Sequence, residues 1–217
     1  MDEKPSNFTE GQIMSDTRTD MLGRVKTALA ILPERAALPN WDAELAIARK
    51  LMEERDSLEV FAERIKLVNG MAMTDFAELA AYLKKGGWLQ GYCDPGLVSM
   101  FEPKLGPEFK LKTDFDRTRI DDYAFGITRA AGGIAETGTI ILNDALTSRR
   151  LGALTPWVHV AVLPRHLIHR TMTDAVLALG EDPNVIWATG PSKTADIEGI
   201  LIEGVHGPGV QIALVIE

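Results

Sequence analysis

Apolar positions in the first part of the chain recur every three to four residues, which is the spacing of α-helices. One such segment begins at Met21, and a second begins near Trp41 and continues toward the sequence VNG. Thr74 is the predicted N-cap of the segment DFAELAAYLKK, which Gly86 and Gly87 end. The pattern therefore predicts that the chain before residue 85 is mostly helical.

The pattern changes after residue 85, where short β-branched runs stand between turn residues. We predict strands at the sequences GWLQGY, EFKLKTDF, AFGIT, GTIIL, WVHVAVL, NVIWAT and VQIALVIE. Helices are expected between some of them, in DPGLVSMFEP, RHLIHRTMTDAVLALG and ADIEGILIE. This alternation is typical of an α/β fold, with a mostly parallel sheet flanked by helices and a helical N-terminal extension.

The same pattern predicts how the chain is divided. Residues 1–18 are polar and aperiodic, which predicts a flexible tail. Residues 19–84 make up the helical N-terminal region and residues 85–217 the α/β core. With 217 residues, of which 46% are hydrophobic, the chain can bury a sizeable core. We expect the helical region and the α/β core to form one compact domain.

Charge and hydropathy exclude two classes of partner. The formal net charge is −8 at pH 7, with acidic and basic residues interspersed. This balance argues against nucleic acid, because neutralised phosphates dominate such binding. No run of about 18 apolar residues occurs, so no membrane span is expected. The sequence MDEKPSNFTEGQ has no apolar signal core behind it, and we expect the protein to stay in the cytoplasm.

Cys93 is the only cysteine of the chain. A single cysteine forms no internal disulfide and cannot supply the several thiolates that an iron–sulfur cluster needs. Because no base or triad stands beside it in the sequence, Cys93 is interpreted as a structural residue rather than a nucleophile. We therefore expect no cofactor on this chain and place any cluster on another protein.

Several motifs do not carry a site. GPSKT lacks the glycine that a phosphate loop has directly before its lysine, and GVHGPGV lacks the dinucleotide-binding spacing. His166 and His169 share a predicted helix, but Arg165 and Arg170 flank them and would repel a cation, so no metal site is predicted. His159, in WVHVAVL, either faces a ligand cleft or lies satisfied in the core, and the sequence leaves both open.

The segment GITRAAGGIAETGTIIL holds the first candidate for chemistry. Glu136 stands between AAGGIA, interpreted as a helix-like turn, and a predicted strand. Gly138 leaves room for a close backbone approach, and Thr137 and Thr139 offer hydroxyl groups. Glu136 is a candidate nucleophile or general base. Alternatively it caps nearby backbone amides, and the residues alone do not separate the two.

The segment GPSKTADIEGILIEGVHGPG is the second candidate. We expect the strand NVIWAT to deliver Gly190 and Ser192 to the carboxyl end of the sheet, where open α/β folds bind ligands. Ser192 or Thr194 would cap the helix ADIEGILIE, with Asp196 in its first turn, and the helix amides would favour a small carboxylate or a phosphate. His206, on the following turn, is a candidate proton donor or shuttle. The alternative is that these residues only cap and turn the chain.

Four blocks, GITRAAGGIAETGTIIL, WVHVAVLPRHLI, GPSKTADIE and GVHGPG, closely resemble the lactate utilization (LUD) domain family and its LutC-type branch. The resemblance covers roughly residues 85–217. It implies a fold similar to the NagB/RpiA/CoA transferase superfamily. It also implies an accessory subunit that acts beside two iron–sulfur proteins, of the LutA and LutB types, in oxidising L-lactate to pyruvate. The expected ligand is a small hydroxy or oxo carboxylate.

The resemblance also suggests a sharper role for Glu136, because CoA transferases of that superfamily form an acyl intermediate on a glutamate in a glycine-containing turn. The alternatives to an accessory subunit are therefore a self-contained CoA-transferase-like or hydrolase enzyme that uses Glu136, and a non-catalytic assembly protein. Glu136 and His206 are the predicted catalytic residues. The predicted ligand-binding residues are Thr137, Gly138, Thr139, His159, Gly190, Ser192, Thr194 and Asp196.

Overall fold

The structure, a computed structural model, describes residues 10–31, 54–144, 146, 150–181, 184–195 and 201–217. The chain divides into two compact units, Met1–Leu45 and Ala46–Glu217. In the first unit, helix α1 (Glu10–Leu29) begins within the segment that was predicted to be a tail, well before Met21. The described side chains of α1, from residue 17 onward, are all exposed.

The centre of the second unit is a six-stranded sheet in which every neighbouring pair of strands is parallel. This confirms the prediction of an α/β fold built on a mostly parallel sheet with helices around it. In spatial order its strands are β1 (Met71–Met73), β12 (Val210–Ile216), β7 (Val158–Pro164), β4 (Phe125–Arg129), β2 (Gln90–Cys93) and β3 (Lys110–Lys112).

A second, four-stranded sheet lies beside the first and corrects the prediction of a single sheet. Its order is β8 (Ile168–His169), β5 (Gly132–Ile134), β6 (Thr139–Asn143) and β9 (Val185–Ala188). The sequences GTIIL and NVIWAT do form strands, but these pair antiparallel to each other here rather than in the parallel sheet. AAGGIA is not a helix-like turn, because it contains strand β5, which pairs with both β6 and β8.

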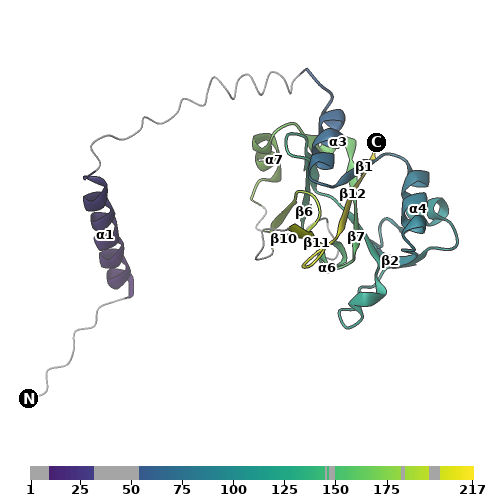
Figure 1. Ribbon diagram of the computed structural model, residues 1–217, viewed down its shortest axis with the longest axis horizontal. Helices are drawn as coiled ribbons and strands as arrows, with labels where there is room; N and C mark the ends of the chain where they lie inside the picture. Colours follow the sequence, from purple (N-terminus) through teal and green to yellow (C-terminus); the bar gives the residue numbers. More distant parts are fainter. Residues whose placement is uncertain (1–9, 32–53, 145, 147–149, 182–183, 196–200) are drawn as a thin grey trace, which may run out of the picture. The chain divides into compact units, whose positions relative to one another are not determined.

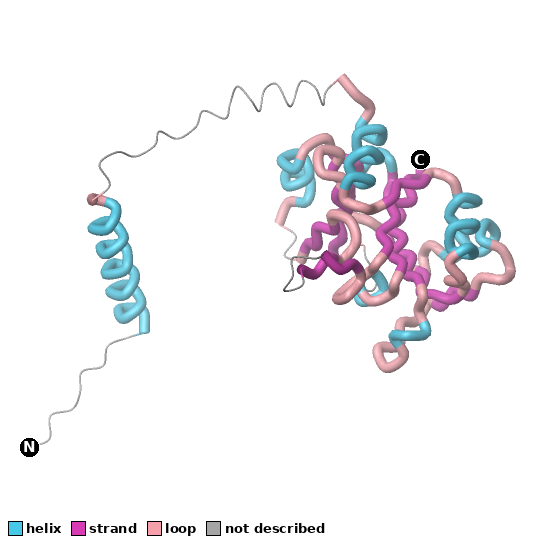
Figure 2. The backbone as a smooth tube through the Cα atoms, viewed as in Figure 1, coloured by secondary structure: helices cyan, strands magenta, loops and turns pink. Residues whose placement is uncertain are grey.

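The two faces of the parallel sheet follow from strict alternation along its strands. In β7, Val158, Val160 and Val162 pack in one core with α4 (Phe76–Lys85) and α5 (Val98–Leu105). Ala161 and Leu163 pack in the other core with α3 (Ser57–Leu67) and the second sheet. Figure 1 shows α4 on one side of β12 and β7 and α3 on the other, and Figure 2 shows helices, in cyan, along both sides of the strands.

The remaining elements close the ends and edges of these layers. Helix α6 (Arg150–Leu154) contacts β4 and β7, and α7 (Met172–Leu179) packs on the far face of the second sheet through Ala175, Ile134 and Ile141. The short helices η1 (Ile120–Asp122) and η2 (Arg165–Leu167) follow β3 and β7. Strands β10 (Lys193–Ala195) and β11 (Leu201–Glu203) pair antiparallel.

Three local predictions are wrong at the level of single elements. The N-cap of α4 is Asp75, not Thr74, because the Asp75 carboxylate accepts a hydrogen bond from the Ala77 amide at 2.8 Å. RHLIHR is not the start of a helix: it forms η2 and β8, and α7 begins only after the capping box of Thr171 and Asp174. The described ends of ADIEGILIE, with the residues before it, form strands β10 and β11 instead of a helix.

Candidate functional site

The candidate site begins at the turn between β5 and β6, which contains Glu136, Thr137 and Gly138. The Gly138 amide donates to the Ile134 carbonyl at 2.9 Å and closes the turn. Gly138 has a φ of +67°, and a Cβ atom there would lie 2.2 Å from the backbone nitrogen of Ile65 in α3. The predicted close approach is therefore present, and the backbone that approaches is the last part of α3. Only glycine fits this turn against that helix.

Glu136 is exposed, and its Oε2 atom accepts a hydrogen bond from the Met172 amide at 3.0 Å. Met172 is the first residue of α7, so this carboxylate satisfies one of the amides that a helix leaves unpaired at its N-terminus. The negative charge also lies favourably at the positive end of the helix dipole. Of the two interpretations of Glu136, the structure shows the capping contact directly.

Three threonine hydroxyls form a chain beside this turn. Thr137 Oγ1 lies 2.6 Å from Thr139 Oγ1, and Thr139 Oγ1 lies 2.7 Å from Thr189 Oγ1. Thr139 is buried and Thr189 is exposed. The row of three hydroxyl groups therefore connects the interior of the turn with the surface. Thr189 was missed from the sequence, since only the antiparallel pairing of β6 with β9 places it opposite Thr139.

The C-terminal end of α3 brings the two predicted segments together. Gly190 has a φ of +81°, and a Cβ atom there would lie 2.2 Å from the Val68 carbonyl oxygen. The same carbonyl accepts from Lys193 Nζ at 3.2 Å. Asn69 Nδ2 donates to Glu203 Oε1 at 2.7 Å, which attaches strand β11 to the same end of α3. The ETG turn and the β10–β11 hairpin therefore share one helix end as support.

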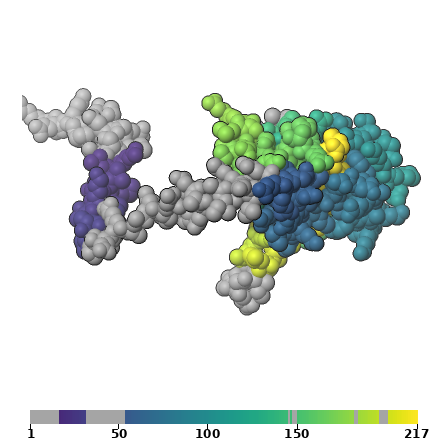
Figure 3. Space-filling view, turned by 90° about the horizontal axis from the view of Figure 1, so that it is seen from above, coloured from purple at the N-terminus to yellow at the C-terminus, as the bar shows by residue number. Residues whose placement is uncertain are grey.

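Ser192 and Thr194 take part in the backbone hydrogen bonds and pairing of the β10–β11 hairpin. The Ser192 amide donates to the Pro208 carbonyl at 2.9 Å, and the Ser192 carbonyl accepts from the Gly204 amide at 2.9 Å. Thr194 lies in β10 opposite Ile202. His206 is exposed on the turn that follows β11. Asp196 lies outside the described residues. In the space-filling view the yellow residues of the hairpin stand out from the second unit (Figure 3).

His159 is 1% exposed and lies on β7 between β4 and β12. Its Nε2 atom is 2.9 Å from Thr128 Oγ1, and its Nδ1 atom is 2.9 Å from the Gln211 amide nitrogen. Both ring nitrogens therefore have a hydrogen-bond partner. Burial lowers the pKa of His159 to about 4, against the opposing effect of the Gln211 hydrogen bond. This geometry matches a satisfied, neutral core histidine rather than one that faces a cleft.

The other candidates for nucleophilic or metal chemistry are placed as follows. Cys93 is buried, and burial together with the neighbouring Asp94 raises the pKa of its thiol to about 12, so it stays protonated at neutral pH. His166 and His169 do not share a helix, because they belong to η2 and β8. Within the ranges that the structure describes, no three side chains of the types His, Cys, Asp and Glu form a metal-binding group.

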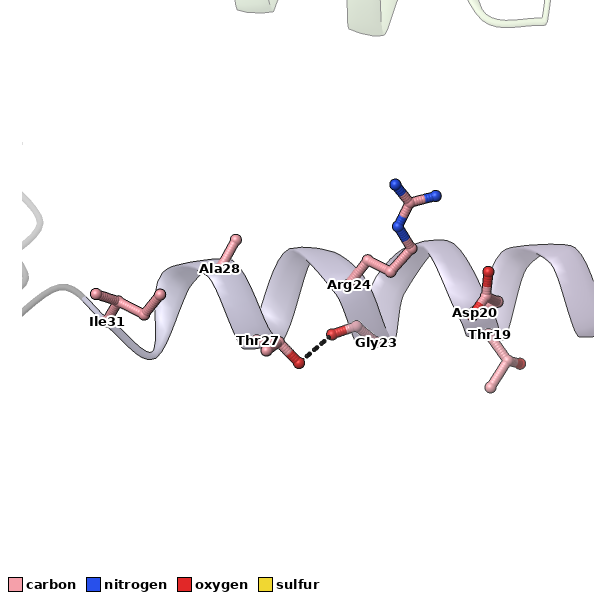
Figure 4. Close-up of a pocket in the computed structure, with 7 residues that line it drawn as sticks. All are labelled: Thr19, Asp20, Gly23, Arg24, Thr27, Ala28 and Ile31. Atoms are coloured by element: carbon pink, nitrogen blue, oxygen red, sulfur yellow. Dashed lines mark hydrogen bonds between the residues drawn. The ribbon is translucent and has the colours of Figure 1, made fainter.

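Two surface hollows lie away from these residues. One runs along α1, and all the side chains that line it come from residues 19–31, so no second element forms an opposing wall there (Figure 4). The other, with a volume of about 450 Å³, lies between α5 and β3 and is lined mainly by prolines and aliphatic or aromatic side chains. Neither hollow contains a residue predicted from the sequence. No helix in the described part of the chain is long and apolar enough to cross a bilayer.

A sequence profile of the LUD domain matches residues 39–216. "Lactate utilization protein C" of Bacillus licheniformis is 34% identical over 107 residues, covering 46% of this chain and 45% of that protein. Its namesake in Deinococcus radiodurans is 40% identical over 87 residues, covering 38% and 41%. "Lactate utilization protein C 1" of Bacillus mycoides is 26% identical over 213 residues, covering 88% and 89%. The first two alignments thus span less than half of the relatives' own length.

One solved structure is similar in fold. It is the crystal structure of a DUF162 family protein from Deinococcus radiodurans, with a TM-score of 0.56 and 24% sequence identity. The match covers 76% of this chain and 98% of that one. At this level of identity the likeness concerns the arrangement of helices and strands.

Proposed function

The chain belongs to the LUD domain family, and on that premise we propose that it is an accessory subunit of an L-lactate utilization system. In this role it acts in the cytoplasm with iron–sulfur proteins of the LutA and LutB types, which carry the electrons released when L-lactate is oxidised to pyruvate. Its own contribution is to bind a small hydroxy or oxo carboxylate.

The observation that carries the proposal is the LUD domain match over residues 39–216, joined to relatives named "Lactate utilization protein C". One of these relatives aligns along 88% of this chain, so the likeness extends through both the helical and the α/β parts of the second unit. The allocation of electron transfer to partners follows from the chemistry of the chain. Its single cysteine cannot supply the several thiolates that a cluster needs, and that cysteine is buried.

The finer fold assignment, to the NagB/RpiA/CoA transferase superfamily, is also a proposal. What supports it is the open parallel sheet with helices on both faces and a glutamate in a glycine turn. The acyl chemistry of that superfamily is less well supported here. An acyl-forming carboxylate must be able to attack a thioester, whereas Glu136 Oε2 accepts a hydrogen bond from the N-terminus of α7, which stabilises its charge and opposes attack.

The proposal is tested with the full chain and the LutA- and LutB-type proteins of the same organism. The measurement is the reduction of a dye by L-lactate, with each protein left out in turn, together with co-purification of the three. We expect the rate to fall to background when this chain is omitted. Two results together would contradict the proposal: a full rate of dye reduction in the mixture that lacks this chain, and failure of this chain to co-purify with the other two proteins.

One observation favours a second candidate, a self-contained transferase or hydrolase. Glu136 is exposed and stands beside the chain of hydroxyls formed by Thr137, Thr139 and Thr189. In that case the chain alone would turn over an acyl-CoA or an ester, and Glu136→Gln would abolish the turnover. The predicted catalytic roles of Glu136 and His206, and the ligand roles of the hairpin residues, stay predictions until this is measured.

A further inference from the structure

The order of strands in the parallel sheet defines one place where a ligand crevice is expected. Among the strands of this sheet, the next one in the chain after β2 is β3, which lies on its outer side, whereas the next one after β4 is β7, which lies on the opposite side. The connections of the neighbouring strands β2 and β4 therefore leave in opposite directions. In open α/β sheets, ligands bind outside the carboxyl ends of two strands that diverge in this way.

Two charged residues stand at this position. Asp94 directly follows β2, and Arg129 is the last residue of β4. The Asp94 amide donates to the Ile127 carbonyl at 2.9 Å, which holds the two strand ends together. Arg129 Nε lies 3.7 Å from Asp94 Oδ1. Neither residue was predicted from the sequence, because the strand order that makes them neighbours is not visible there.

The Asp94 side chain is 5% exposed, and that of Arg129 is 44% exposed. Asp94 Oδ1 also accepts from the Gly96 amide at 2.8 Å, so the buried carboxylate is held in one orientation. A Cβ atom at Gly96 would lie 1.9 Å from Arg129 Nη2. The glycine therefore makes room for the guanidinium, which lies over the turn after β2. A partly exposed cation therefore lies beside a buried anion at the position where the sheet topology places a ligand.

The chemistry of this pair selects the ligand class. A guanidinium presents planar donors that match the two oxygens of a carboxylate. The neighbouring Asp94 offsets one unit of positive charge, which disfavours a doubly charged phosphate more than a singly charged carboxylate. The two parallel N–H donors of the guanidinium orient the carboxylate by themselves.

We infer that Arg129, at the carboxyl ends of β2 and β4, binds the carboxylate of a small 2-hydroxy or 2-oxo acid, with Asp94 as the residue that positions it. This inference rests on the proposed function for the choice of acid, but its residues and location come from the sheet topology and from the Asp94, Gly96 and Arg129 geometry.

The test is calorimetric titration of the full chain with L-lactate, pyruvate and glycolate, with sulfate and phosphate as anion controls. We expect at least one of the three acids to bind, and Arg129→Gln to raise its dissociation constant at least about tenfold. Arg129→Lys keeps the charge but not the fork, so we expect an intermediate loss. The matched control is Arg64→Gln, which removes an exposed arginine of α3, the helix that leads into the amino end of β1, and leaves the dissociation constant unchanged.

A double-mutant cycle separates the positioning role of Asp94 from a structural one. Asp94→Asn is expected to weaken binding in the wild-type background and to have no further effect when Arg129→Gln is present. Unchanged acid binding in Arg129→Gln, tighter binding of phosphate than of any acid, or no binding of the three acids would each overturn the inference.

The outcomes for the two proposals are distinguishable. If the three-protein mixture oxidises L-lactate equally well with Arg129→Gln and with the wild type, the inference about Arg129 fails and the accessory role stands. If the mixture needs no such chain, the accessory role fails, whatever the titrations show.

Discussion

His159 makes the free energy of unfolding depend on pH. The pKa of its imidazole is about 4 in the folded chain, against an ordinary value of 6.5. Because the folded pKa is depressed, the stabilisation is complete above about pH 6.5 and is lost as the pH falls toward 4, where the unfolded chain binds a proton that the folded chain does not. Between about pH 6.5 and pH 4, protonation of His159 in the unfolded chain should lower the free energy of unfolding by up to about 3 kcal/mol.

The measurement is urea unfolding of the wild type and of His159→Gln at about pH 7 and about pH 4.5. The variant is expected to be less stable at neutral pH, because the hydrogen bonds to Thr128 and Gln211 are disturbed. It should nevertheless lose less stability on acidification than the wild type does. An identical loss in both proteins would assign the pH dependence to other groups.

Two glycines with left-handed backbone separate backbone strain from steric contact. In Gly138→Ala the alanine must adopt a positive φ, and its Cβ atom must also lie against the backbone of α3. In Gly180→Ala only the backbone strain applies, since nothing lies within 4 Å of the Cβ position. We expect a loss of about 3 kcal/mol for Gly138→Ala and about 1 kcal/mol for Gly180→Ala. Equal midpoints of urea unfolding for the two variants would show that the turn moves away from α3.

At this scale the sequence could predict types of residue but not their neighbours. The need for glycine at position 138 was predictable from the crowded ETG turn, although the partner, Ile65, was not. The sequence alone did not decide between a catalytic and a capping role for Glu136. The Met172 amide that it binds comes from a helix 36 residues further along the chain. Asp94 and Arg129 were missed because their meeting depends on strand order.

The start of helix α7 depends on a side chain from another element. Glu136→Ala removes the acceptor of the Met172 amide, and we expect a loss of about 0.5–1 kcal/mol with faster hydrogen exchange in the first turn of α7. Glu136→Gln keeps an oxygen acceptor and loses only the charge, so its loss should be smaller. Exchange rates from nuclear magnetic resonance decide this, and unchanged protection of the Met172 amide in the alanine variant would contradict it.

Among the elements, those with strong periodicity were predictable and those made by tertiary pairing were not. The run WVHVAVL gave β7 because a buried parallel strand is a continuous apolar run. Strand β5 was missed, since Gly132 and Gly133 carry no β-branched signal and are strand residues only through β6 and β8. The segment ADIEGILIE was predicted to be a helix although its described ends lie in β10 and β11, because amphipathic spacing in so short a segment fits both structures.

One buried side chain of α3 contributes strongly to the stability of the second unit. Phe61→Ala removes a fully buried side chain and should cost about 3–5 kcal/mol in free energy of unfolding. Thermal and urea unfolding measure this loss, and a variant as stable as the wild type would contradict the expectation.

For the molecule as a whole, the class of the fold was predictable and its division into several sheets was not. Alternating strands and helices indicate α/β architecture, but the strand order that places β12 between β1 and β7 appears only in the structure. The boundary between a helical region and the α/β core, drawn at residue 85, stays a prediction. Residues before it supply α3, α4 and β1 to the same compact unit.

The position of β12 also governs the order of events during synthesis. It is the latest of the six parallel strands in the chain, yet it lies in the interior of the sheet, with β1 on one edge and β7 on the other. Until the ribosome has released it, β1 has no strand to join and β7 keeps a bare edge of backbone amides and carbonyls. The nascent chain therefore leaves β1 and one edge of β7 unpaired until β12 emerges, and such bare strand edges are prone to aggregation.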